Sequence, residues 1–288
     1  MSPNTLGALF MMASMASFTL NDTLIKLTDG AVPLMQLLFL RGVLSSVLIY
    51  GVARGLGTLQ FDLARRDWGL VALRSAAEIG AAYFFLTALF NMPLANVTAV
   101  LQVLPLTVAL GAAFFFREPL GWRRMAAILL GFMGMLLIVR PGPEGFSLWS
   151  AYALMAVVCV TIRDLATRRL SPGVPSMTVT FVAAVTVMGF AGVASAATPW
   201  VTIDLWLAAL IAGSAVFIIG GYWFSVQVMR VGEISFVAPF RYTGLVWALL
   251  LGWLIFGDWP TNLTLVGAGI VVATGLFTLY RERALSQR

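Results

Sequence analysis

Ten apolar runs, each long enough to cross a lipid bilayer as an α-helix, follow one another along this chain. A transmembrane helix needs about 20 predominantly apolar residues, and the connections between the runs are too short to hold a soluble domain. The pattern therefore predicts an all-α integral membrane protein with ten transmembrane helices. The runs are Thr5–Leu27, Pro33–Ala53, Trp68–Phe90, Leu94–Phe116, Trp122–Val139, Leu148–Ala166, Met177–Ala197, Leu205–Met229, Ile234–Phe256 and Leu263–Tyr280.

The amino-acid composition argues against several functions. Hydrophobic residues make up 60% of the chain and charged residues 10%, against about 25% charged residues in soluble domains. The net charge of +6 is spread between apolar runs, so no nucleic-acid partner is expected. With no histidine, a single cysteine (Cys159) and no phosphate-binding Gly-x-x-x-x-Gly-Lys loop, the chain lacks the usual parts of a metal site, a thiol enzyme or an ATPase. We expect neither an enzyme nor a cofactor.

The distribution of basic residues predicts the orientation. Lysine and arginine concentrate on the cytoplasmic side of membrane proteins, and here the opposite side carries only Lys26 and Arg140. No basic segment precedes the first run, which we interpret as a retained helix. We expect a multi-pass protein of the bacterial inner membrane with both termini in the cytoplasm. The arginines on the side of the N-terminus are Arg54, Arg65, Arg66, Arg117, Arg123, Arg124, Arg163, Arg168, Arg169, Arg230, Arg281, Arg283 and Arg288.

The two halves of the chain resemble each other at a constant offset of about 140 residues. This offset matches Asp22 to Asp164, Tyr83 to Tyr222 and Glu118 to Asp258. Each half holds five runs, an odd number, so the two copies must have opposite orientations. We place the first repeat at residues 1–141 and the second at 142–288. Inverted repeats of this kind enclose a substrate site near the membrane midplane, which favours a transporter.

Several short motifs carry a resemblance to a known family: Ala95-Asn96-Val97-Thr98-Ala99 before Pro105, Phe116-Arg117-Glu118-Pro119, Gly131-Phe132-Met133-Gly134, Val237-Ala238-Pro239-Phe240-Arg241-Tyr242 and Phe256-Gly257-Asp258-Trp259-Pro260. The chain resembles the EamA branch of the drug/metabolite transporter superfamily over nearly its whole length. The resemblance implies a central cavity lined by the first, third, fourth, sixth, eighth and ninth runs. It also implies export of amino acids, aromatic ones included, or movement of related metabolites. One departure is that the second copy has Pro239, several residues earlier than the place of Pro105.

Charged residues inside apolar runs are the first candidates for function, because an intramembrane charge faces a partner or a wet cavity. One group falls in the cytoplasmic half and suggests a network that closes the inner gate. Asp22 and Arg41 fall in the outer half and suggest a paired counterpart. The alternative for both groups is a set of fixed ion pairs that orient helices. The cytoplasmic group is Arg74, Glu78, Arg163, Asp164 and Arg241.

A second set of residues suits a small amphipathic ligand. Glu78 is the most central carboxylate, a candidate for a substrate ammonium group or for a coupling proton. The planar guanidinium of Arg241 suits a substrate carboxylate. Polar tips on an apolar wall fix the orientation of a ligand, although tyrosines also form belts at the membrane interface. The candidates of this kind are Asn21, Tyr83, Gln102, Tyr222 and Tyr242.

These observations together predict a secondary transporter that exports amino acids by alternating access. Its partners would be the amino-acid substrate and the lipid bilayer, with protons as a candidate coupling ion. A monomer is expected, with a dimer as the alternative. Other cargoes to consider are S-adenosylmethionine, a nucleotide-linked sugar or a cationic drug. From other classes, an intramembrane enzyme would require a catalytic triad in the cavity, and a non-transporting scaffold would have a filled centre.

Overall fold

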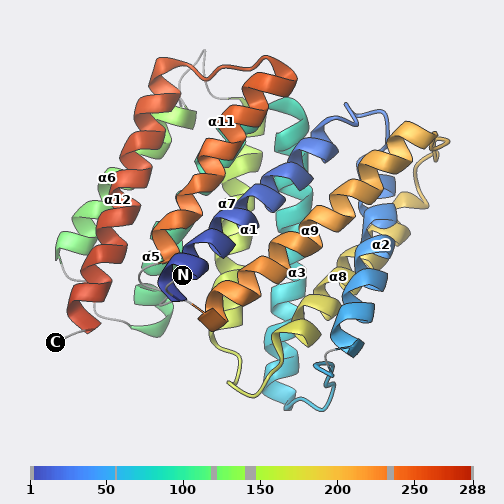
Figure 1. Cartoon of the computed structure of the whole chain (residues 1–288), viewed down its shortest axis with the longest axis horizontal. Helices are drawn as coiled ribbons and strands as arrows, with labels where there is room; N and C mark the ends of the chain where they lie inside the picture. The colour runs from blue at the N-terminus through green and yellow to red at the C-terminus, as the bar shows by residue number, and fades with distance from the viewer. Residues whose placement is uncertain (1–2, 56, 118–121, 140–146, 232–236, 287–288) are drawn as a thin grey trace.

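The computed structural model describes residues 3–55, 57–117, 122–139, 147–231 and 237–286, and the described ranges contain helices without strands (Figure 1). The predicted repeat boundary at 141/142 lies outside them. The helices are α1 (Pro3–Lys26), α2 (Leu34–Gly55), α3 (Arg65–Asn91), α4 (Leu94–Leu101), α5 (Leu104–Phe116), α6 (Trp122–Val139), α7 (Leu148–Arg168), α8 (Ser176–Ser195), α9 (Leu205–Val231), the 3₁₀ helix η1 (Ala238–Tyr242), α11 (Thr243–Phe256) and α12 (Asn262–Ser286).

All ten predicted spans are present as helices, which confirms the fold class. Seven spans are long and apolar enough to cross a membrane, and shorter apolar helices occupy the fifth, ninth and tenth. Two spans are broken. The fourth is divided into α4 and α5 because Pro105 has no amide hydrogen for the carbonyl of Leu101, the residue at which α4 ends. The ninth begins as η1, with Pro239 at its start, and continues as α11.

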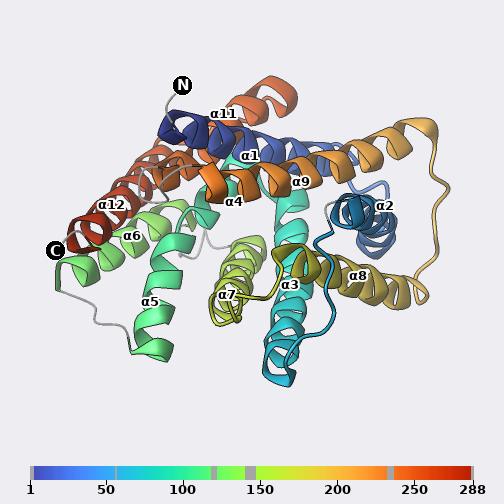
Figure 2. The same ribbon diagram turned by 60° about the horizontal axis from the view of Figure 1, so that its bottom comes forward.

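The packing of the two halves follows the pattern of an inverted repeat. The first span of each half packs against the third span of the other half, α1 against α9 and α7 against α3 (Figures 1 and 2). The second spans, α2 and α8, pair with each other, as do the fifth spans, α6 and α12. The described helices of the two halves are therefore interlocked through these four pairings.

A side chain at the start of α2 and another at the start of α8 each make two hydrogen bonds to backbone groups of the other half. The Gln36 carboxamide donates to the Val201 carbonyl at 2.8 Å and accepts from the Val201 amide at 3.0 Å. In the other half, the Thr178 hydroxyl accepts from the Gln60 amide at 3.0 Å and donates to the Thr58 carbonyl at 3.4 Å. Each second span therefore holds the loop that follows the second span of the other half.

The structure contains two similar cation–π contacts, each with a phenylalanine that ends a helix. The Lys26 Nζ lies 5.5 Å from the ring centroid of Phe256 and donates to carbonyl oxygens at the end of α3. The Arg169 guanidinium lies 4.2 Å from the ring centroid of Phe116. Phe116 and Phe256 each end a helix, before a residue in the left-handed region.

Helix α12 passes so close to η1 that one glycine is required. A Cβ atom at Gly275 would overlap the Tyr242 hydroxyl. We expect Gly275→Ala to destabilise the protein by about 1–3 kcal/mol, because overpacking displaces side chains and backbone. Thermal unfolding of the purified protein in detergent measures the effect.

Gly269→Ala is the matched control for this prediction. Gly269 lies on the same helix, and no described heavy atom lies within 4 Å of its added Cβ, so this variant should be as stable as the wild type or more so. In a Tyr242→Leu background, Gly275→Ala should lose most of its effect. Equal stability of the Gly275→Ala and Gly269→Ala variants would contradict the assignment.

Candidate functional site

A cavity of about 280 Å³ lies between the two halves. Its walls come from the first, third, fourth, sixth, eighth and ninth spans, as the family resemblance implied, and from the second span in addition. The volume is at the lower end of the range of small-molecule sites, about 300–1,000 Å³. The lining residues are Met15, Phe18, Thr19, Asn21, Asp22, Arg41, Glu78, Ala81, Ala82, Phe85, Leu86, Thr98, Leu101, Gln102, Leu104, Val160, Arg163, Ile218, Tyr222, Arg241 and Gly244.

Glu78 on α3 is held between two arginines. Its Oε1 lies 3.3 Å from Arg163 Nη1, and its Oε2 lies 3.7 Å from Arg74 Nη2. Arg163 also contacts Asp164 at 2.9 Å, and Arg74 donates from Nε to the Thr167 hydroxyl at 3.1 Å. The sequence placed Arg74 and Glu78 on one helix face, and the structure contains this ion pair. The charge of Glu78 is thereby largely neutralised by protein groups.

Asp22 and Arg41 are connected through Asn21. The Asn21 amide donates to Asp22 Oδ1 at 2.9 Å, and Arg41 Nη1 donates to Asn21 Oδ1 at 3.4 Å. Among the residues that the structure describes, no cationic nitrogen lies within 4 Å of the Asp22 carboxylate. The expected direct Asp22–Arg41 ion pair is therefore replaced by an amide bridge, because Asn21 occupies the space between the two charges.

Arg241 and Gln102 lie where the two broken spans face the cavity. Gln102 is buried at the C-terminal cap of α4, and Arg241 is an exposed residue of η1. In the described part of the chain, no carboxylate oxygen lies within 4 Å of the Arg241 guanidinium. Among the described residues, this cavity guanidinium therefore has no counter-ion at contact distance.

Of the three candidate tyrosines, the structure places Tyr222 in the cavity wall, where its ring meets Phe18 edge-on at 5.4 Å. Tyr83 instead contacts Phe84 and Tyr152, away from the cavity. Tyr242 is buried against α12. Neither Tyr83 nor Tyr242 is among the residues that line this cavity.

Helix geometry explains both positions. The cavity face of α3 carries Glu78, Ala81, Ala82, Phe85 and Leu86, and at 3.6 residues per turn Tyr83 lies to one side of the middle of that face. In the 3₁₀ helix η1, neighbouring side chains diverge by about 120°, so Arg241 faces the cavity while Tyr242 faces α12. The same periodicity, continued from Glu78, identifies a cavity residue that the sequence interpretation missed, Phe85.

Two interlocked five-span halves around a cavity with charged groups on an otherwise apolar wall define the class, a membrane transporter built on inverted repeats. The sequence model of the EamA-like transporter family matches the chain twice, at residues 5–140 and 147–280. The chain belongs to this family, which lies within the drug/metabolite transporter superfamily.

Curated relatives of similar length are transporters of several metabolites. The chain is 25% identical to an S-adenosylmethionine uptake transporter of Rickettsia bellii, with 99% of this chain and 97% of that protein aligned. It is 26% identical to a riboflavin transporter of Vibrio cholerae, over 98% and 95%. It is 25% identical to a pseudopaline exporter of Pseudomonas aeruginosa, over 95% and 96%. A solved crystal structure shares the fold, with a TM-score of 0.67 at 19% identity over 96% of this chain and 98% of the other.

Proposed function

We propose that the protein transports a small metabolite that carries both a carboxylate and a cationic group, by alternating access across the bacterial inner membrane, with both termini in the cytoplasm. Amino acids with an apolar or aromatic side chain are the first candidates. The observation that carries the proposal is the Arg241 guanidinium, which has no carboxylate within 4 Å among the described residues, in a cavity that also contains the Asp22 carboxylate.

Arg241 is the group that would bind the substrate carboxylate. A guanidinium binds a carboxylate through two parallel N–H···O bonds, and Arg163 and Arg74 already contact Glu78. Arg241 also lies in a broken span, and discontinuous helices form the substrate sites of many transporters with inverted repeats. The proposal therefore keeps the role that the sequence suggested for Arg241.

Asp22, rather than Glu78, would bind the cationic group. Glu78 has two arginine neighbours, so a substrate ammonium group would compete with them. Asp22 accepts a hydrogen bond from a neutral amide and has Arg41 only beyond that amide, so a substrate cation would compete with less protein charge there than at Glu78. In this proposal Glu78, Arg74, Arg163 and Asp164 form the ion-pair network that positions α3 against α7 and acts in gating.

The apolar walls and the named relatives suggest the body of the substrate. Phe18, Phe85 and Met15 line the cavity with flat or adaptable apolar surface, which suits an aromatic side chain. S-adenosylmethionine is a second candidate, because the R. bellii relative is named for it and it carries an amino-acid group on a cationic sulfonium. Riboflavin has no carboxylate and would leave Arg241 unpaired.

Counterflow in proteoliposomes tests the proposal. Vesicles with purified protein are preloaded with unlabelled substrate and exposed to radiolabelled L-phenylalanine, L-tyrosine or S-adenosylmethionine. We expect accumulation of at least one label above that in protein-free vesicles. Reversing the gradients measures the direction of transport, because the relatives include both uptake transporters and exporters. Failure of all three labels to accumulate would reject the proposed substrate class.

A further inference from the structure

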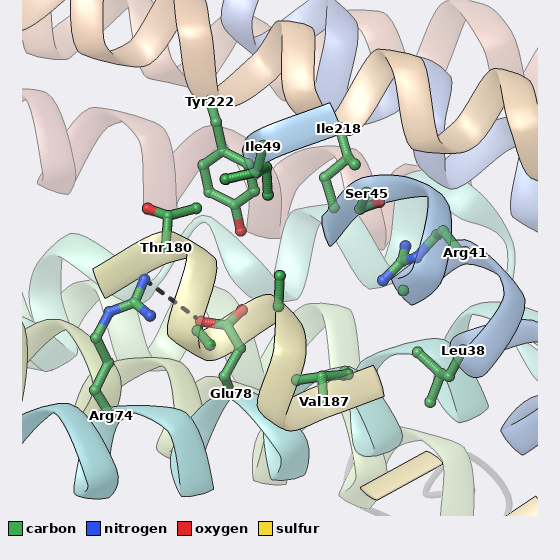
Figure 3. Close-up of a pocket in the computed structure, with 14 residues that line it drawn as sticks. Leu38, Arg41, Ser45, Ile49, Arg74, Glu78, Thr180, Val187, Ile218 and Tyr222 are labelled. Carbon is green, nitrogen blue, oxygen red and sulfur yellow. Dashed lines mark ion pairs between the residues drawn. The ribbon is translucent and has the colours of Figure 1, made fainter. Parts of the chain in front are cut away.

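A second, smaller pocket of about 70 Å³ opens beside the cavity, between α2, α3, α8 and α9 (Figure 3). It shares Arg41, Glu78, Ala82, Ile218 and Tyr222 with the cavity, so it is a side branch of the same space. In the close-up, Arg74 and Glu78 face one another at one end of this side pocket, and Tyr222 points toward Glu78 from α9.

Three side chains that line the side pocket contain a buried polar atom without a hydrogen-bond partner among the described residues. These atoms are Ser45 Oγ, Arg74 Nη1 and Glu78 Oε2; Glu78 Oε2 has an ion-pair partner in Arg74 Nη2 at 3.7 Å but accepts no hydrogen bond from a described residue. Ser45 and Arg74 are more than nine-tenths buried. Buried polar atoms are rarely left without a partner, because they lose their hydrogen bonds to water and gain nothing in return. The side pocket therefore requires an occupant that both donates and accepts hydrogen bonds.

We propose that the side pocket is a subsite for a hydroxyl group of the substrate, at the far end of the molecule from its amino-acid group. A hydroxyl accepts from Arg74 Nη1 while it donates to Glu78 Oε2, and Ser45 can act in either sense. An ammonium group would face Arg41 and Arg74, and a carboxylate would face Glu78, so a neutral group fits better than either.

The walls of the side pocket support a small group rather than a large one. Gly42, Ala82, Ala183 and Ala184 contribute little side-chain volume, and the space equals about two water molecules. Tyr222 stands where the two spaces join and contacts Phe18 of the cavity wall. An aromatic ring in the cavity would therefore extend a ring hydroxyl into the side pocket. This inference rests on the proposed function and adds to it a preference for tyrosine over phenylalanine.

Binding of radiolabelled L-tyrosine and L-phenylalanine to the purified protein tests the subsite, because the two amino acids differ by one hydroxyl. The wild type should bind tyrosine more tightly, since a site built to bond a hydroxyl rejects the analogue without it. Ser45→Ala should weaken tyrosine binding about 2- to 10-fold and leave phenylalanine unchanged. Ala184→Leu, which fills the side pocket, should reduce tyrosine binding further.

Ser46→Ala is the matched control. Ser46 is the next residue of α2, is equally buried and also has an unpartnered hydroxyl among the described residues, but it is not among the residues that line the side pocket. It should leave the ratio of tyrosine to phenylalanine affinity unchanged. If the two amino acids bind with the same ratio in all variants, water alone fills the pocket and the subsite is rejected while the proposed function stands. If neither binds the wild type, both the subsite and the amino-acid form of the proposed function are rejected.

Discussion

Replacing Arg241 by alanine is expected to weaken binding of a carboxylate-bearing substrate about 10- to 100-fold, the range for one lost charged hydrogen-bonding contact. The loss should be large because the other two arginines that line the cavity are engaged with protein groups, Arg163 with Glu78 and Arg41 with Asn21. The affinity of Arg241→Lys should lie between those of the wild type and Arg241→Ala, because lysine keeps the charge but lacks the planar guanidinium group. Binding of the radiolabelled substrate to purified protein measures the change.

Two controls separate recognition of the carboxylate from a general loss of positive charge. Arg65→Ala removes a charge from the exposed start of α3, away from the cavity, and should retain wild-type affinity. The amide derivative of the substrate, which has no carboxylate, should bind the wild type and Arg241→Ala equally. Wild-type affinity of Arg241→Ala for the carboxylate form would show that the substrate binds elsewhere.

The positions of the spans could be predicted from sequence because the bilayer imposes the rule. An apolar run of about 20 residues has no stable alternative to a helix in hydrocarbon, where every backbone group must be satisfied within the segment. The break between α4 and α5 was not predicted, because Leu94–Phe116 was treated as one span; its cause is Pro105, which leaves the Leu101 carbonyl without its donor. The partner of each span in the other half depends on the folded arrangement, and no single apolar run determines it.

The site was less predictable, because a side chain's direction depends on the rotation of its helix. Tyr83 and Tyr222 occupy matching repeat positions, yet one contacts Tyr152 and the other lines the cavity. The ion-pair partners of Glu78 were also only partly predictable from the sequence. Arg74 was expected from its spacing of four residues, whereas Arg163 lies on another helix 85 positions away. The side pocket was missed because its key group, Ser45, looks in sequence like any small residue of a packed helix.

Replacing Glu78 by glutamine should have the second large effect, a loss of about 3 kcal/mol in the free energy of unfolding. Removing one partner of a buried ion pair costs about 3–5 kcal/mol, and a side chain 18% exposed at a cavity should fall at the lower end of this range. The variant leaves Arg74 with the Thr167 hydroxyl and Arg163 with Asp164, two cations with one carboxylate at contact distance. Unfolding in mixed micelles measures the loss.

A double-mutant cycle identifies the cause of this loss. Arg74→Gln removes the extra cation, so the Glu78→Gln, Arg74→Gln double variant should be more stable than the sum of the two single losses predicts. Asp164→Asn provides a comparison. Asp164 is more exposed than Glu78 and contacts Arg163 but not Arg74, so this variant should lose less unfolding free energy than Glu78→Gln. Strict additivity of the two single variants would mean that Arg74 and Glu78 do not stabilise each other. The link between α3 and α7 would then depend on the contacts of Glu78 with Arg163 and of Arg74 with Thr167, without support from the ion pair within α3.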